Sequence, residues 1–130
     1  MSGPLPGECR ILRLLDDGTP VVQFDDTSLA LPIDGVEVPV PLPVGYVQIM
    51  IDRLGRPGQR LRCEPDPAGT GTARFSYLAW QDKSGDVWAD LAQTLLEEGL
   101  VRVAAAPFLQ RSSYQRFEQT ARNQRLGIWQ

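Results

Sequence analysis

A run of prolines in the segment VEVPVPLPV, residues 36–44, restricts the possible folds of this chain more than any other feature of its sequence. Pro39, Pro41 and Pro43 lack a backbone N–H, so the segment suits neither a central strand nor the interior of a helix. We therefore predict an extended loop here. It separates a β-rich N-terminal part from a second part that contains both strands and helices.

Five short strands are predicted from alternating or β-rich stretches that turn residues bound. They lie in residues 8–24, where the DDGT turn at 16–19 makes a hairpin, and in residues 29–33, 59–65 and 74–80. Turns or loops are expected between them at 25–28, 65–73 and 81–86.

Helical spacing of apolar residues predicts three helices. Residues 46–54 suit a short helix, although YVQIMI also has the residue types of a strand. Residues 87–98 predict a second helix, capped by Ser84 or Asp86 and ended by Gly99. A third helix is expected from Ser112, with Tyr114, Phe117 and Ala121 on its inner face, and Gly127 as its end.

This order of elements predicts an α+β fold. Five strands, one helix between the third and fourth, and two C-terminal helices fit a small Greek-key barrel of the OB type. A length of 130 residues predicts a single domain with its own core. We place it at residues 8–130 and expect residues 1–7, with two prolines and two glycines, to be flexible.

Composition excludes several kinds of site. The chain has no histidine, which rules out His-based zinc sites, Ser–His–Asp triads and Cys–His dyads. The N-terminus does not resemble a signal peptide, and no apolar run is long enough to span a membrane. We therefore expect a cytoplasmic protein that does not bind a membrane, with Cys9 and Cys63 as free thiols.

Charge is unevenly distributed along the chain. Residues 1–98 have 8 Lys+Arg and 15 Asp+Glu, a net charge of −7, whereas residues 99–130 have five Arg and one Glu, a net charge of +4. Arg116, Arg122 and Arg125 of the expected last helix are candidate contacts to a nucleic acid or a partner protein. The alternative is that these arginines only solvate the outer face of a terminal helix.

The C-terminal stretch SGDVWADLAQTLLEEGLVRV, followed by Pro107, an aromatic helix and LGIW, resembles the C-terminal half of staphylococcal-nuclease-like (thermonuclease) domains. LLDDGTPVVQF is similar to the first turn of that family, and LALPIDGVE to its R-L-x-G-I-D-A-P-E motif. The resemblance implies an OB-fold domain and hydrolysis of phosphodiesters. Family enzymes hold Ca²⁺ with two aspartates, use a glutamate on water and bind the phosphate with two arginines.

Carried over position by position, the resemblance implies a damaged site. Asp34 and Glu37 match the second metal aspartate and the catalytic glutamate, and Asp17 serves as the first metal ligand only after a one-residue slip. Leu29 replaces the first arginine, and Arg74 matches the second only after another slip. A transition-state arginine can contribute about 10³–10⁵ in rate, so the resemblance implies a degenerate member of the family.

Three hypotheses follow. The first is a domain without efficient catalysis and without a cofactor, which binds a partner protein or single-stranded nucleic acid. The second is a weak Ca²⁺-dependent nuclease that uses Asp17, Asp34, Glu37 and Arg74. The third is a barrel that supports a methyl-arginine-binding Tudor module. The sequence lacks the insertion and the aromatic cage that such a module needs. The sequence does not specify the ligand or the oligomeric state.

Overall fold

The computed structural model describes residues 8–24, 26–65, 71–105 and 111–130, apart from the side chain of Asp82. The flexible N-terminus predicted at 1–7, and parts of the predicted turn at 25–28 and loop at 65–73, lie outside this range. The strands are β1 (Glu8–Leu14), β2 (Pro20–Phe24), β3 (Thr27–Ala30), β4 (Val36–Glu37), β5 (Leu61–Pro65), β6 (Ala73–Asp82), β7 (Gly85–Asp90) and β8 (Arg102–Val103). The helices are α1 (Tyr46–Leu54), α2 (Leu91–Glu97), α3 (Arg111–Asn123) and the 3₁₀ turn η1 (Gly127–Trp129).

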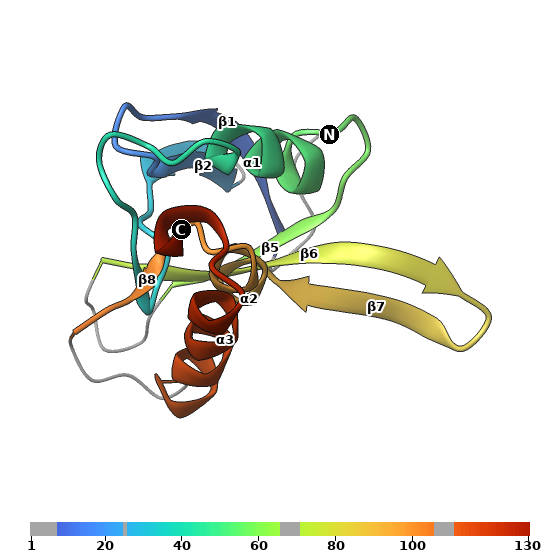
Figure 1. Ribbon diagram of the computed structural model, residues 1–130. Coiled ribbons are helices and arrows are strands. Elements are labelled where there is room, and N and C mark those ends of the chain that lie inside the picture. Colours follow the sequence, from blue (N-terminus) through green and yellow to red (C-terminus); the bar gives the residue numbers. More distant parts are fainter. Residues whose placement is uncertain (1–7, 25, 66–70, 106–110) are drawn as a thin grey trace.

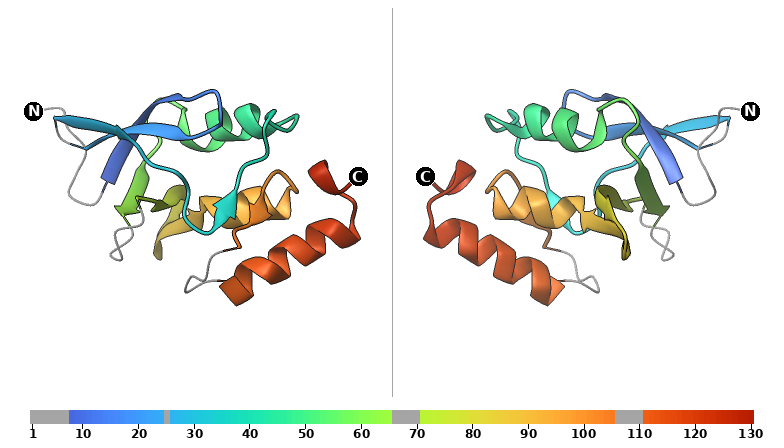
Figure 2. Two further views of the ribbon diagram at one scale, coloured as in Figure 1. Left: turned by 90° about the vertical axis from the view of Figure 1, so that its left-hand side faces the viewer. Right: turned by 90° about the vertical axis from the view of Figure 1, so that its right-hand side faces the viewer.

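Six strands form one antiparallel sheet in the order β3-β2-β1-β5-β6-β7, and β4 pairs with β8 in a separate ribbon. α1 lies on one side with β1 and β2, and α2 lies between α1 and α3 (Figures 1 and 2). The hairpin of β6 and β7 extends beyond this body (Figure 1). The predicted α+β class, the helix between the third and fourth predicted strands and the two C-terminal helices are confirmed.

The prediction of a closed barrel is wrong, because the sheet is open between β3 and β7. The chain beyond β3 does reach β6, where the backbone N–H of Asp34 donates to Ala73 (2.9 Å) and that of Ala73 donates to Pro32 (2.9 Å). This is a single parallel bridge between Ile33 and Ala73. It does not extend into a ladder, because Pro32 lacks a donor and Gly35, at φ +83°, turns the chain away.

The core joins the inner face of the sheet to α1 and α2. Tyr46 and Met50 of α1, Phe75 of β6, and Leu91 and Leu95 of α2 are all essentially inaccessible to solvent. α1 has the predicted bounds. In α3, Tyr114 and Ala121 are buried and Phe117 is half-buried, as predicted, but the helix ends at Asn123, before Gly127.

The helix predicted at 87–98 is wrong in its first half. Residues up to Asp90 form β7, with Val87 opposite Trp80 and Trp88 opposite Leu78. The helix begins at Leu91 with Asp90 as its cap, because the Asp90 carboxylate accepts the backbone N–H of Ala92 (3.1 Å). Val and Trp suit a strand, and a pairing partner in β6 outweighs the helical spacing.

The prediction of free thiols is also wrong, because Cys9 of β1 and Cys63 of β5 form a disulfide with their Cα atoms 5.9 Å apart. Adjacent antiparallel strands bring the two positions within bonding distance, which the sequence does not reveal. Within the described residues, no helix has the length and apolarity needed to cross a membrane. Disulfides are typical of oxidising compartments. This bond therefore argues against the cytoplasmic location, which stays a prediction.

The tryptophans differ from one another. Trp88 and Trp129 are half-buried, in line with packing roles, whereas Trp80 is 60% exposed. Trp80 lies on the part of the hairpin that extends past the core, so it does not pack in the core.

Candidate functional site

Asp17 lies in the turn between β1 and β2. Its carboxylate accepts the backbone N–H of Thr19 (2.9 Å), and this hydrogen bond holds the pKa of Asp17 below its ordinary value. The side chain is exposed. Such a bond within a turn is typical of Asp at this position, so the geometry gives Asp17 a local structural role.

Asp34 follows the bridge between Ile33 and Ala73. Its carboxylate accepts the hydroxyl of Thr72 (3.0 Å), and its backbone N–H is bound to β6. The conformation of Gly35 then directs the chain into β4. Asp34 is thus held beside the start of β6, the strand that contains Arg74.

Glu37 ends β4 and pairs with Arg102 of β8. Both side chains are exposed. In the described parts of the chain, no three His, Cys, Asp or Glu side chains form a group that could hold a metal ion. The structure therefore does not gather Asp17, Asp34 and Glu37 into one site, and calcium binding and catalysis by these residues stay predictions.

Arg74 lies on the outer face of β6, opposite Glu64 of β5. Its Nε is 3.9 Å from Oδ2 of Asp90, and the Tyr114 hydroxyl donates to the same oxygen (2.7 Å). The other oxygen of Asp90 caps α2. One carboxylate therefore joins the arginine to the start of α2 and to the buried face of α3.

The surroundings of Tyr114 raise its pKa. Burial raises this pKa most, and the hydrogen bond and charge of Asp90 raise it further. The charge of Asp34 also raises it, and that of Arg74 lowers it. The structure thus groups Arg74 of the predicted site with Asp90 and Tyr114, which were not predicted, and binds Asp34 to the start of the same strand.

A hollow of about 600 Å³ lies beside Arg74, between the outer face of the sheet and α2. Trp88, Ser76 and Thr94 contribute to its walls. Its charged lining is Arg74 together with the carboxylates Glu64, Asp90 and Glu97. One guanidinium among three carboxylates gives the lining residues a net negative charge, which disfavours an anionic phosphodiester. Arg62, which lies over the Trp88 ring, offsets part of this charge.

The candidate contact arginines lie in and after α3. Arg122 is paired with Glu118 (2.9 Å), and its guanidinium lies 4.2 Å from the centre of the Trp129 ring. Glu118 also accepts the backbone N–H of Val103 (2.7 Å), which ties α3 to β8. All three arginines are exposed, but Arg122 also has a structural role through these contacts.

Sequence reasoning missed Asp90 and Tyr114 as members of this group. Asp90 directly precedes the apolar run LAQTLL, which is the position of a helix N-cap, and this signal was present in the sequence. Tyr114 was identified only as a core residue, and its hydroxyl partner depends on how α3 packs.

No model of a known protein family matches this chain, and no curated protein sequence matches it either.

Proposed function

We propose that this protein is a degenerate staphylococcal-nuclease-like domain of OB type that has lost efficient catalysis and binds a partner protein. The observation that carries the proposal is the environment of Arg74. This guanidinium is next to Asp90 and lines a hollow with three carboxylates. An arginine that stabilises a phosphoryl transition state needs to face a space that admits the negatively charged substrate.

The position expected for the other arginine supports the same conclusion. Leu29 lies in β3 with 40% of its side chain exposed. Leucine cannot donate hydrogen bonds to phosphate. The parallel bridge between Ile33 and Ala73 supports the relation to OB-type folds. It pairs the end of the third predicted strand with the residue before the fifth, although no ladder closes the sheet.

A protein partner agrees better with the surface than a nucleic acid does. The chain has a net charge of −3, and Arg122 is already paired with Glu118. Nucleic-acid affinity depends on unpaired cations that replace counterions. If nucleic acid is the ligand, binding will weaken steeply with salt and after charge reversal at Arg116 and Arg125.

The alternative is a weak Ca²⁺-dependent endonuclease, which the binding of Asp34 to the start of the strand that contains Arg74 favours. A nuclease assay on single-stranded DNA and RNA, with Ca²⁺ and with a chelator, distinguishes the two. We expect no metal-dependent cleavage, and equal background for the wild type and Glu37→Gln. Cleavage that requires Ca²⁺ and is lost in Glu37→Gln would contradict the proposed function.

A further inference from the structure

The surface between β1 and α1 exposes apolar side chains beside a hollow. Leu12 of β1 is 49% exposed, and Val47 and Ile51 of α1 are 44% and 52% exposed. Together with the buried Met50, they line a hollow of about 330 Å³. We call this surface, lined by Leu12, Arg13, Val47, Met50 and Ile51, the β1–α1 groove.

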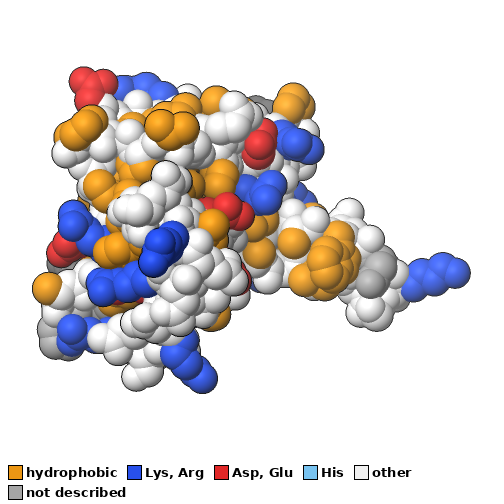
Figure 3. Space-filling view, in the orientation of Figure 1, with side chains coloured by type: hydrophobic (Ala, Val, Ile, Leu, Met, Phe, Trp, Pro, Cys, Tyr) orange, Lys and Arg blue, Asp and Glu red, His pale blue; other side chains and the backbone are white. Residues whose placement is uncertain are grey.

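Local structure explains why these side chains point outward. Val47 and Ile51 are four residues apart, so they lie on one face of α1. Leu12 is the extra residue of a β-bulge, because Ile11 pairs with Val22 whereas Arg13 pairs with Val21. Hydrophobic side chains accordingly gather over the part of the molecule that contains β1 and α1 (Figure 3).

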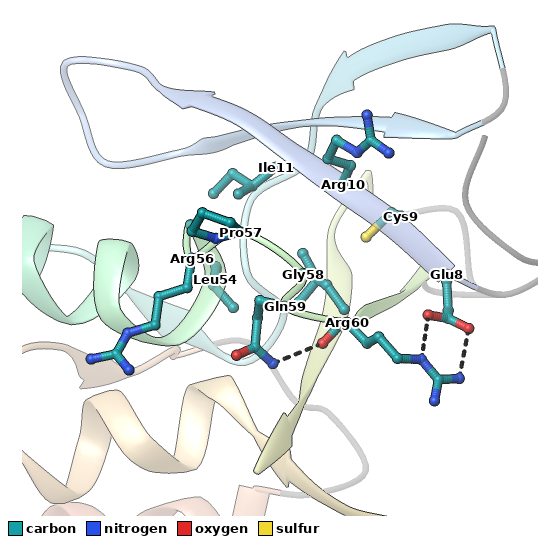
Figure 4. Close-up of a pocket in the computed structure, with 12 residues that line it drawn as sticks. Glu8, Cys9, Arg10, Ile11, Leu54, Arg56, Pro57, Gly58, Gln59 and Arg60 are labelled. Carbon is teal, nitrogen blue, oxygen red and sulfur yellow. Dashed lines mark hydrogen bonds and ion pairs between the residues drawn. The ribbon is translucent and has the colours of Figure 1, made fainter. Parts of the chain in front are cut away.

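A second hollow, of about 570 Å³, continues the surface along β1 and shares Ile11 and Gly55 with the groove. In Figure 4, the side chains of Arg10 and Arg56 extend outward from opposite sides of it. The Glu8 carboxylate of this hollow is bound by Arg60 (3.0 Å).

Positive charge flanks this apolar strip. Arg13 lines the groove, and Arg56 follows α1 and lines the adjoining hollow. Both are exposed, and neither has an ion-pair partner among the residues described here. The nearby carboxylate Asp52 already accepts the side-chain amide of Gln48 (2.9 Å).

We propose that the β1–α1 groove binds an acidic amphipathic helix of a partner protein. Apolar anchors of the helix would cover Leu12, Val47 and Ile51, and its carboxylates would meet Arg13 and Arg56. This inference rests on the proposed function, for which it specifies the partner and the site.

The geometry argues against the other occupants. An added strand cannot pair here, because β1 is already hydrogen-bonded to β2 and β5. A second copy is a poor ligand. Packing its exposed α1 face into the groove would bring Arg13 and Arg56 of the two copies together, and the apolar residues of α2 are buried in its own core. A nucleic acid would use the arginines but not the apolar strip.

The test uses a labelled synthetic peptide of about 18 residues, five helical turns, with leucines on one face and glutamates on the rest. A scrambled peptide and a peptide with lysine for glutamate serve as ligand controls. Fluorescence anisotropy measures binding to the wild type, Ile51→Asp and the double variant Arg13→Glu/Arg56→Glu. Circular dichroism confirms that each variant is folded.

We expect the acidic peptide to bind best, and both groove variants to weaken it by about tenfold or more. The matched variants Val87→Asp and Lys83→Glu, at exposed positions of the β6–β7 hairpin, should bind like the wild type. Equal binding of the acidic and lysine peptides, or no effect of the groove variants, would overturn the inference.

Two further results would overturn it in favour of another occupant. Single-stranded DNA that binds the wild type and Ile51→Asp equally, but not the double arginine variant, would indicate a nucleic acid. Dimerisation in sedimentation velocity that Ile51→Asp abolishes would indicate a second copy. The nuclease assay on the same samples separates the two proposals, because cleavage refutes the proposed function whereas failure of peptide binding refutes only the groove.

Discussion

Gly99 forms the turn that ends α2, and this turn is hydrogen-bonded to the C-terminal segment. Its φ of +72° puts it in the left-handed region, and the backbone N–H groups of Gly99 and Leu100 donate to Leu96 and Leu95 (both 3.0 Å). This is a Schellman motif. The Gly99 carbonyl then accepts the N–H of Ile128 (2.8 Å), so the same residue joins η1 to α2.

We predict that Gly99→Ala lowers the free energy of unfolding by about 3 kcal/mol or more, from the left-handed conformation and from steric overlap. The new Cβ would overlap the carbonyl of Leu126. Gly58→Ala is the matched control, because its φ is +78° with nothing near the new Cβ. It should cost only about 1–2 kcal/mol. Equal losses for the two variants in urea denaturation would contradict this account of Gly99.

Two buried tyrosines make the free energy of unfolding depend on pH in the alkaline range. Burial raises the pKa of Tyr46, whose hydroxyl donates to Gly18 (2.8 Å), and burial with the Asp90 hydrogen bond raises that of Tyr114. The unfolded chain therefore loses these protons first as pH rises. Their contribution to stability is complete below the unfolded pKa of about 10 and is lost above it.

We therefore predict that the free energy of unfolding falls above about pH 10, by up to about 1.4 kcal/mol per pH unit for each tyrosine. Tyr46→Phe and Tyr114→Phe should each make this decline shallower. Urea denaturation at several alkaline pH values measures the slopes. The same slope in all three proteins would show that other groups cause the decline.

At the scale of elements, the β6–β7 hairpin divides into a packed base and an exposed end. Trp88 at the base has the guanidinium of Arg62 3.9 Å and that of Arg60 5.4 Å from its ring centre. Trp80 is farther along the hairpin and is mostly exposed. The two tryptophans therefore contribute differently to stability although they lie on adjacent strands.

We predict that Trp88→Ala lowers the free energy of unfolding by about 1–2 kcal/mol, from lost burial and cation–π contacts. Trp80→Ala should change it by no more than about 0.5 kcal/mol. Chemical denaturation of both variants, followed by far-UV circular dichroism, checks the difference. A larger loss for Trp80→Ala would mean that the end of the hairpin packs against something.

At the scale of the whole molecule, the disulfide joins positions 54 residues apart, on β1 and β5. Closing a loop of this length in the unfolded chain stabilises the fold by about 4 kcal/mol in the chain-entropy model. We predict that reduction, or the double variant Cys9→Ser/Cys63→Ser, lowers the free energy of unfolding by about 2–4 kcal/mol. Denaturation with and without dithiothreitol measures this. A double variant that still responds to dithiothreitol would point to an effect of the reductant itself.

Only part of the candidate site was predicted. The local sequence determines the positions of some of its residues, whereas strand register determines the contacts of others. Asp17 and Asp34 lie at turns that the local sequence marks, so their positions on the chain were predictable. The ion pair between Arg74 and Asp90 depends on the register of β6 against β7. That register exists because residues 87–90, which were predicted as helix, are part of strand β7.

The sequence by itself determined the α+β class, the bounds of α1, the end of α2 at Gly99 and the buried face of α3. Each follows from local spacing or from one glycine, and local preferences act over a few residues. Tertiary structure alone decided the open sheet, the disulfide, the pairing of β7 with β6 and the acidic surroundings of Arg74. These depend on which strands pair and in what register, and pairing energy comes from residues far apart in the sequence.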